Sequence, residues 1–250
     1  MTNFAQRNDG VRIAWEEAGE GAAIVLVHGF ASDRVQNWRA PGWYQTLTAA
    51  GRRVVALDCR GHGESDKPHD PGSYGDRMVD DVVAVMAAAG IDDADVMGYS
   101  MGGMLTMGLM MRHPGRVRRA VIAGVGASYF REAGIRRDGI ADALLAADPA
   151  TLKDPIQRQF RIFAGQAGKD LAALAACMRE PRTVYRPEQL GTWPGPVLVV
   201  CGERDTLTGP PDGLADAFGQ GRAVTVTGRD HMTAVGDKLY KQAVLEFLGN

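Results

Sequence analysis

Short apolar segments alternate along this chain with longer segments whose apolar residues recur at helical spacing. The apolar segments are rich in Val, Ile and Leu, which is typical of strands buried on both faces of a sheet. They are Ala23–Val27, Val54–Leu57, Asp95–Met97, Val117–Ile122, Val197–Val200 and Ala223–Val226. Val11–Glu16 alternates apolar and polar residues and predicts an edge strand. Because strands that alternate with helices imply crossover connections, the sequence predicts an α/β fold with a mostly parallel sheet flanked by helices.

Helical spacing is clearest in Asp76–Ala89, where the apolar side chains fall on one face. Gly90 follows, at the position of a C-terminal cap. The last part of the chain, Leu239–Leu248, predicts a further helix with a less regular apolar face.

The region from Ser128 to Trp193 breaks the alternation. Leu152–Phe163 and Lys169–Met178 favour helices, and no segment there is typical of a strand. We therefore expect a small helical lid at residues 128–193, inserted between the two parts of an α/β core, 1–127 and 194–250. Four aromatic residues in or beside this region either line an acyl pocket or pack the lid onto the core: Phe130, Phe160, Phe163 and Trp193.

Composition narrows the classes of function. A chain of 250 residues that is 45% hydrophobic suits one α/β domain. The net charge of −2, with no Lys or Arg cluster, gives no reason to expect a nucleic acid partner. Met1–Gly10 lacks the features of a secretory signal and no apolar run is long enough to cross a membrane, so we expect a cytoplasmic protein without a membrane partner.

The three cysteines, Cys59, Cys177 and Cys201, are far apart and form no pattern with histidine that is typical of a metal site. We expect them to be small buried apolar residues. No motif calls for a cofactor or a metal.

The strongest chemical signal is Gly98-Tyr99-Ser100-Met101-Gly102, a G-x-S-x-G motif between a predicted strand and a Met- and Leu-rich helix. A strand-to-helix turn this tight strains its central residue and leaves no room for Cβ atoms at the flanking glycines. The turn exposes the hydroxyl of Ser100 above the sheet edge, at the N-terminus of the next helix. We predict that Ser100 is a nucleophile.

A serine needs a base to take its proton, and in this type of fold the acid and the histidine follow the serine in the chain. Of five histidines only His113 and His231 come after Ser100. His113 lies at the end of the helix that follows Ser100 and is expected to point away from the serine. His231 follows the strand Ala223–Val226, at the sheet edge where such sites lie. We predict that His231 is the base.

The acid that orients the base is expected after the preceding strand, Val197–Val200. Asp205 is our prediction and Glu203 its nearest rival. Asp230 is disfavoured because it adjoins His231 in the sequence. Each of these carboxylates could instead be a solvated loop residue.

An oxyanion needs two N–H donors. The first is expected from Met101, directly after the nucleophile, and the second from Phe30, in the loop that follows Ala23–Val27. His28 follows a buried strand and is expected to bind backbone groups rather than to transfer protons.

In these motifs the chain resembles the α/β-hydrolase superfamily, in particular its serine esterases and cofactor-free haloperoxidases. The resemblance covers nearly the whole chain and rests on His28-Gly29-Phe30, on Asp58–Ser65, on Gly98–Gly103, on Gly202–Asp205 and on His231. It implies that Asp58, Arg60 and His62 are scaffolding. Relatives with an aspartate nucleophile are excluded by Ser100, and relatives that carry Trp after the catalytic histidine are disfavoured because Met232 stands there.

The function expected from these residues is hydrolysis of carboxylic esters of small to medium size through an acyl-enzyme intermediate. Four other reactions of the same triad stay open: those of a lactonase, a thioesterase, a carbon–carbon bond hydrolase and a perhydrolase. The alternative of another class is a hydrolase-like ligand receptor without significant turnover. The expected partner is a small acyl substrate.

Overall fold

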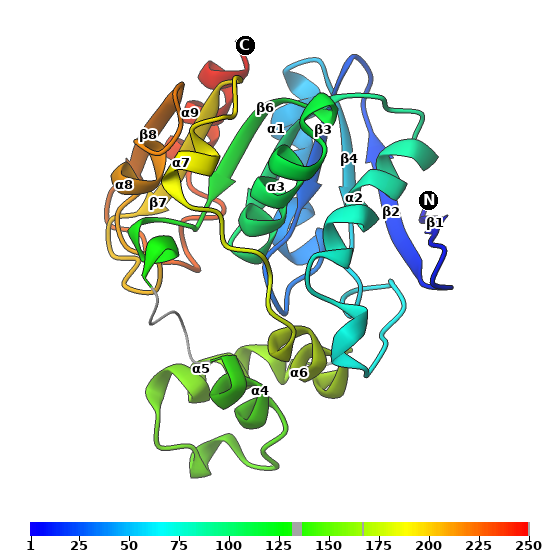
Figure 1. The fold of residues 1–250 in the computed structure, drawn as a ribbon, viewed down its shortest axis with the longest axis vertical. Helices are drawn as coiled ribbons and strands as arrows, with labels where there is room; N and C mark the ends of the chain where they lie inside the picture. The colour runs from blue at the N-terminus through cyan, green and yellow to red at the C-terminus, as the bar shows by residue number, and fades with distance from the viewer. Residues whose placement is uncertain (132–136, 167, 250) are drawn as a thin grey trace.

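The computed structural model describes residues 1–131, 137–166 and 168–249 (Figure 1). Eight strands form one sheet in the order β1-β2-β4-β3-β5-β6-β7-β8, with β1 antiparallel to β2, β2 antiparallel to β4 and all other pairs parallel. The strands are β1 (Asn3–Gln6), β2 (Arg12–Ala18), β3 (Ala22–Val27), β4 (Arg52–Leu57), β5 (Ala94–Tyr99), β6 (Val117–Ala123), β7 (Val197–Gly202) and β8 (Gly221–Val226). The predicted α/β fold with a mostly parallel sheet is confirmed.

The edge of the sheet differs from the prediction. The segment Val11–Glu16 forms most of β2, which lies between β1 and β4 and is therefore not an edge strand. The edge is β1, whose register pairs Asn3 with Trp15. It was missed because only Ala5 of its four residues is buried, so no apolar pattern marks it.

Helices cover both faces of the sheet and bury alternate strand residues. Helices α2 and α3 pack with Val25, Val27 and Val55 in one apolar cluster. Helices α1 and α9 pack with Ile24, Leu26 and Val54 on the opposite face. The helices of the sheet region are α1 (Trp43–Ala49), α2 (Arg77–Ala88), α3 (Met101–Arg112), α7 (Pro187–Leu190), α8 (Asp212–Ala215) and α9 (Lys238–Leu248).

Three further helices, α4 (Arg137–Leu144), α5 (Pro155–Ala164) and α6 (Leu171–Arg179), lie together beyond the end of the sheet at which the arrow of β6 points (Figure 1). They share their own small apolar cluster, which includes Ile140, Leu144 and Leu174. We call these three helices the cap. The described residues of 128–193 contain no strand, but Trp193 packs into the cluster of the sheet region, and the boundaries of the lid stay a prediction.

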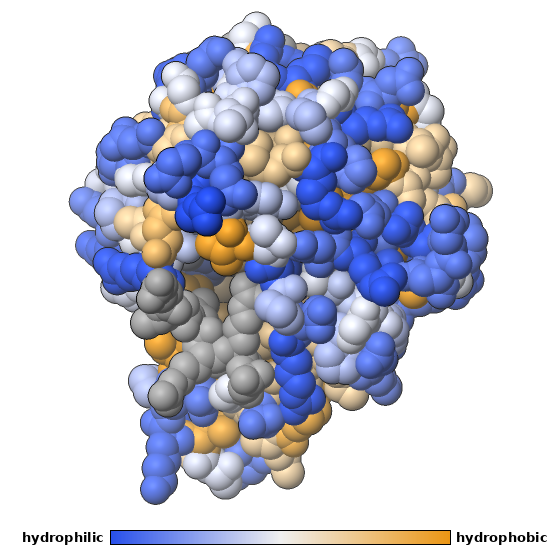
Figure 2. Space-filling model, in the orientation of Figure 1, coloured by the Kyte–Doolittle hydropathy of each residue, from blue (hydrophilic) through white to orange (hydrophobic). Residues whose placement is uncertain are grey.

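The face of the molecule in Figure 2 is mostly hydrophilic, with apolar residues in small separate groups. The three cysteines are buried, as expected, and burial raises the pKa of Cys59 and Cys201. Within the described part of the chain, every helix is too short or too polar to cross a bilayer.

Candidate active site

Ser100 lies in the turn between β5 and α3 with φ 55° and ψ −114°. Such a positive φ is strained for a residue with a Cβ atom and costs roughly 1–3 kcal/mol. The flanking glycines make the turn possible, because a Cβ atom on Gly98 would lie 2.1 Å from the Gly102 carbonyl oxygen and one on Gly102 would lie 2.0 Å from that of Val27. The fold therefore fixes the backbone on both sides of Ser100 by direct contact.

The structure brings Ser100, His231 and Asp205 together from three separate loops. The Nε2 atom of His231 lies 3.0 Å from the Ser100 Oγ atom, and its Nδ1 atom lies 2.7 Å from Asp205 Oδ2. Because a carboxylate only accepts, His231 carries its proton on Nδ1, which leaves a lone pair on Nε2 for the serine hydroxyl. The geometry is that of a nucleophile, its base and the group that orients the base.

The carboxylate of Asp205 is fully buried. Burial raises its pKa, but the hydrogen bond with His231, the attraction of that ring and hydrogen bonds with Thr208 act in the opposite direction, and the pKa is lowered overall. Its Oδ1 atom accepts from the backbone N–H groups of Leu207 and Thr208, each at 3.1 Å. Asp205 is thus held as an anion with one oxygen aimed at His231.

The rival residues have other contacts. Glu203 is exposed and accepts from the N–H of Gly228 at 2.7 Å. Asp230 accepts from the N–H groups of Met232 and Thr233 and so closes the turn that contains His231. His113 lies at the far end of α3, 3.3 Å from Asp80. None of these contacts includes the hydroxyl of Ser100.

The loop after β3 lies against the serine turn. Gly29 is so close that an added Cβ atom would lie 3.4 Å from Ser100 Cβ, and its N–H donates to the Asn37 side chain at 3.0 Å. Among the described residues, the N–H groups of Phe30 and Met101 have no hydrogen-bond acceptor. Met101 also opens α3, whose free N–H groups favour negative charge. Of these two donors, Met101 directly follows Ser100, and Phe30 follows Gly29, which lies against Ser100.

Backbone strain is concentrated in these same two turns. Within the described ranges, Ala31 and Ser100 are the non-glycine residues with positive φ, 56° and 55°. One follows Phe30 and the other precedes Met101. Strain of this kind persists where the surrounding structure enforces it, which is common at functional sites.

Two residues that the sequence did not single out position His231. The hydroxyl of Tyr99 donates to the backbone carbonyl of His231 at 2.6 Å. Gly124, at φ 62°, follows β6, and a Cβ atom there would lie 3.1 Å from His231 Cε1. Tyr99 stands inside the G-x-S-x-G motif, but its partner is distant in sequence, so no spacing rule could have assigned it this contact.

The residues expected to be scaffolding are buried and bound to one another or to the backbone. His28 donates from Nδ1 to the Gly29 carbonyl at 2.7 Å and accepts from the Cys59 N–H on Nε2 at 2.9 Å, so it binds backbone groups as predicted. Asp58 pairs with Arg34, and Arg60 pairs with Asp81 at 2.6 Å.

His62 donates from Nδ1 to the Arg60 carbonyl at 2.9 Å, while its buried Nε2 atom has no partner among the described residues. Burial lowers the pKa of both His28 and His62, and the charge of Arg182 lowers that of His62 further. Both rings are therefore neutral near pH 7.

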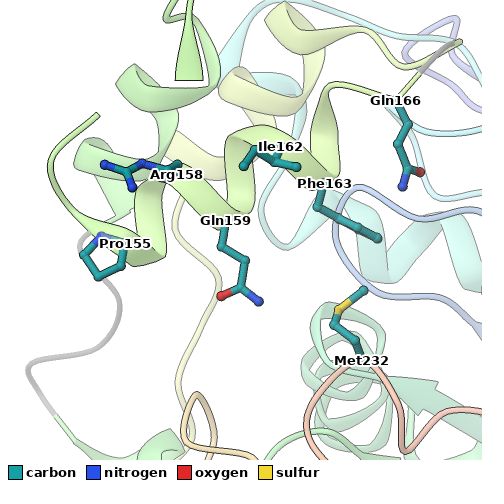
Figure 3. A pocket seen from close by; sticks show the side chains of 7 residues that line it. All are labelled: Pro155, Arg158, Gln159, Ile162, Phe163, Gln166 and Met232. Atoms are coloured by element: carbon teal, nitrogen blue, oxygen red, sulfur yellow. The ribbon is translucent and has the colours of Figure 1, made fainter. Parts of the chain in front are cut away.

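A groove of about 450 Å³ lies between α5 of the cap and the loop of His231. In Figure 3, Phe163 projects from α5 toward Met232, the residue next to His231. Of the four aromatic residues considered for an acyl pocket, Phe163 lines this groove. In contrast, Phe160 of α5 packs against the apolar cluster of the cap and contacts the ring of Phe30, with centroids 6.0 Å apart.

Within the described ranges, no group of three or more His, Cys, Asp or Glu side chains is placed to hold a metal ion.

Comparison with known proteins gives a consistent family. A sequence profile described as the alpha/beta hydrolase fold matches residues 22–137. The chain is 38% identical to a 2-hydroxymuconate semialdehyde hydrolase of Pseudomonas putida over 128 residues, 50% of this chain and 44% of that protein. It is 31% identical to the AB hydrolase superfamily protein YisY of Bacillus subtilis over 64% of this chain and 61% of that protein. The chain thus matches less than half the length of the first relative and less than two thirds of the second.

Solved structures resemble the chain over nearly its whole length. A hydrolase from Pseudomonas aeruginosa has a TM-score of 0.80 and 26% identity, covering 100% of this chain and 98% of its own. Est816, described as an N-acyl homoserine lactone degrading enzyme, has a TM-score of 0.74 and 25% identity, covering 99% of each chain.

Proposed function

This chain belongs to the α/β-hydrolase superfamily, and we propose that it is a serine hydrolase that cleaves carboxylic esters of small to medium size. One observation carries the proposal: the continuous chain of hydrogen-bond distances from Ser100 Oγ through His231 to Asp205, 3.0 Å and 2.7 Å. Such an arrangement activates a serine for attack on an acyl carbon.

The reaction follows from the positions of these groups. Ser100 Oγ attacks the ester carbonyl while His231 Nε2 takes its proton, and Asp205 stabilises the resulting imidazolium. The oxyanion is bound by the N–H groups of Phe30 and Met101, which are otherwise unpaired. His231 then protonates the leaving alcohol. Water, deprotonated by the same histidine, releases the acid from the acyl-enzyme.

The groove beside Met232 is the proposed entrance for the substrate. It lies between the cap and the loop that carries His231, and Phe163 and Ile162 give it apolar walls. About 450 Å³ suits a ligand of small to medium size.

A lactone is the second candidate substrate. It is a cyclic ester, so the same attack opens the ring and leaves the alcohol on the acyl chain. The similarity to Est816 over nearly the whole chain favours this candidate.

The test uses purified protein, a fluorophosphonate probe and a panel of p-nitrophenyl esters and lactones. We expect stoichiometric labelling of the peptide that contains Ser100, loss of activity in proportion to labelling, and turnover of at least one ester or lactone. Labelling at Ser100 without any turnover would favour the ligand receptor. Turnover that survives complete labelling of Ser100 would contradict the proposal.

A further inference from the structure

Arg182, between α6 and α7, is a buried guanidinium without a carboxylate partner. It is 9% exposed, and no Asp or Glu among the described residues lies within ion-pair distance of it. The other three arginines that are buried in the described ranges differ: Arg34 pairs with Asp58, Arg52 with Asp95 at 2.8 Å and Arg60 with Asp81 at 2.6 Å. In the described part of the chain, each of these other buried guanidinium groups thus has a carboxylate of the protein as its partner.

The neighbours of Arg182 are sulfur atoms. Its Nη2 atom lies 3.1 Å from Cys177 Sγ, 3.3 Å from Met101 Sδ and 3.5 Å from Met78 Sδ, and its buried Nε atom has no acceptor. Thioethers are weak acceptors, and a guanidinium presents five donors. A buried charge without a counter-charge or strong acceptors destabilises the folded protein unless an anion binds to it.

The position of Arg182 relates it to the proposed active site. Met101, which its guanidinium touches, directly follows Ser100 and supplies one of the two proposed oxyanion donors. The charge of Arg182 also acts on His62, whose ring lies 5.8 Å from that of Phe30, the other donor residue. The unpaired cation therefore contacts the residue that directly follows Ser100.

We propose that Arg182 binds a carboxylate on the acyl part of the substrate, so that the preferred substrates are esters or lactones whose acyl chain ends in a second carboxylate. A carboxylate matches the fork of the guanidinium and supplies the missing charge. The flexible methionine side chains around Arg182 can move aside for it. This inference rests on the proposed function. Hydrolysis adds one water across the acyl–oxygen bond: an ester releases a dicarboxylate and an alcohol, and a lactone opens to a single hydroxy dicarboxylate.

The test compares matched substrates: p-nitrophenyl hemiesters of dicarboxylic acids from succinate to suberate, each beside the p-nitrophenyl ester of the monocarboxylic acid with the same number of carbons. We expect the wild type to prefer the hemiester at one chain length. In Arg182→Met the ratio of kcat/KM for the two substrates is expected to fall on the order of 10²-fold, the loss typical when one partner of a buried charge pair is removed.

Arg179→Met is the matched control, because Arg179 pairs with the exposed Asp142 on the cap surface. It is expected to keep the ratio within about twofold of the wild type. A ratio that falls equally in both variants, or in neither, would overturn the proposal.

A binding measurement separates this inference from the proposed function. The dicarboxylate of the preferred length is expected to raise the Tm of the wild type and of Arg179→Met, but not that of Arg182→Met or Arg182→Lys. If no ester or lactone is hydrolysed and Ser100 is not labelled, the proposed function is wrong. The change in Tm then tests by itself whether Arg182 binds a carboxylate. If none of the dicarboxylates in the series raises the Tm of the wild type, the proposed carboxylate site is wrong.

Discussion

The two sides of the proposed active site are built differently. On the side of the sheet, the backbone around Ser100 is packed so closely that a Cβ atom added to Gly102 would lie 2.0 Å from the Val27 carbonyl oxygen. The side chain of Asp205 is completely buried. On the side of the cap, the contacts with the sheet region include long, flexible polar side chains beside the ring contact of Phe160 with Phe30. Gln36 accepts from Lys169 at 3.1 Å and donates to Gln166 at 3.2 Å.

This difference indicates that the sheet side determines the rate of the reaction and the cap side the choice of substrate. Catalytic side chains held by backbone packing keep their relative positions, which catalysis requires to within fractions of an ångström. Contacts between flexible side chains can be exchanged at little cost. We therefore expect substitutions on the sheet side to change kcat strongly and substitutions on the cap side to change mainly KM.

The largest expected effect is that of Ser100→Ala. Removal of the nucleophile in this type of triad costs on the order of 10⁶ in kcat. Steady-state hydrolysis of the best p-nitrophenyl ester measures it, with circular dichroism as the control for folding. Near-native activity in a folded Ser100→Ala protein would refute the role of Ser100.

The next effect separates the two candidate acids. Asp205→Asn is expected to lower kcat by roughly 10⁴, because the amide no longer stabilises the imidazolium form of His231. Glu203→Gln is the matched control and is expected to stay within about threefold, since Glu203 binds only the exposed turn at Gly228. A severe loss in the Glu203 variant and a mild one in the Asp205 variant would reverse the assignment.

A smaller effect tests the backbone donor at Phe30. Phe30→Pro removes the N–H and is expected to lower kcat by about 10²–10³, whereas Phe30→Ala keeps the N–H and changes mainly KM. Only variants that melt near the wild-type temperature and still react with a fluorophosphonate are compared. Equal kcat in the two would place the second donor elsewhere, for example at Ala31.

These predictions start from residues that the sequence could identify. Ser100, Asp205 and His231 were predictable because each directly follows a strand, or the turn after one, and strand ends meet at one sheet edge. Arg182 was not, because its burial depends on the packing of α6 against the sheet region. The same holds for β1, whose place at the edge follows from pairing with β2 rather than from an apolar pattern.

The stability of the sheet region is expected to depend on pH through its two buried histidines. The pKa of His28 and of His62 is lowered from 6.5 by burial, so both are neutral when folded and take up protons on unfolding. Their contribution is present above pH 6.5 and is lost as the pH falls below it, by up to about 1.4 kcal/mol per pH unit for each.

Urea titrations between pH 7 and pH 5 measure this loss, because carboxylates stay ionised over that range. In His62→Gln the slope is expected to decrease by about one proton. An unchanged slope in that variant would contradict the assignment of a neutral buried His62.

The smallest effect is expected on the cap side. Lys169→Met removes the hydrogen bonds with Gln36 and Gln166, and side-chain hydrogen bonds of this kind are each worth about 1 kcal/mol. We expect KM to rise by a few-fold and kcat to stay within about twofold. Lys153→Met, at an exposed position of the cap region, is the control. A 100-fold loss of kcat in Lys169→Met would show that the cap holds the chemistry as well.

The central claim, covalent acyl transfer by a serine fixed in the sheet region, is tested most directly by trapping the acyl-enzyme. Wild-type protein is mixed with the best p-nitrophenyl ester, quenched with acid within the first turnover, digested and analysed by mass spectrometry. The account predicts one added acyl group per chain on the peptide that contains Ser100, and none in Ser100→Ala. An acyl group on another residue, or p-nitrophenol released at the wild-type rate by Ser100→Ala, would contradict it.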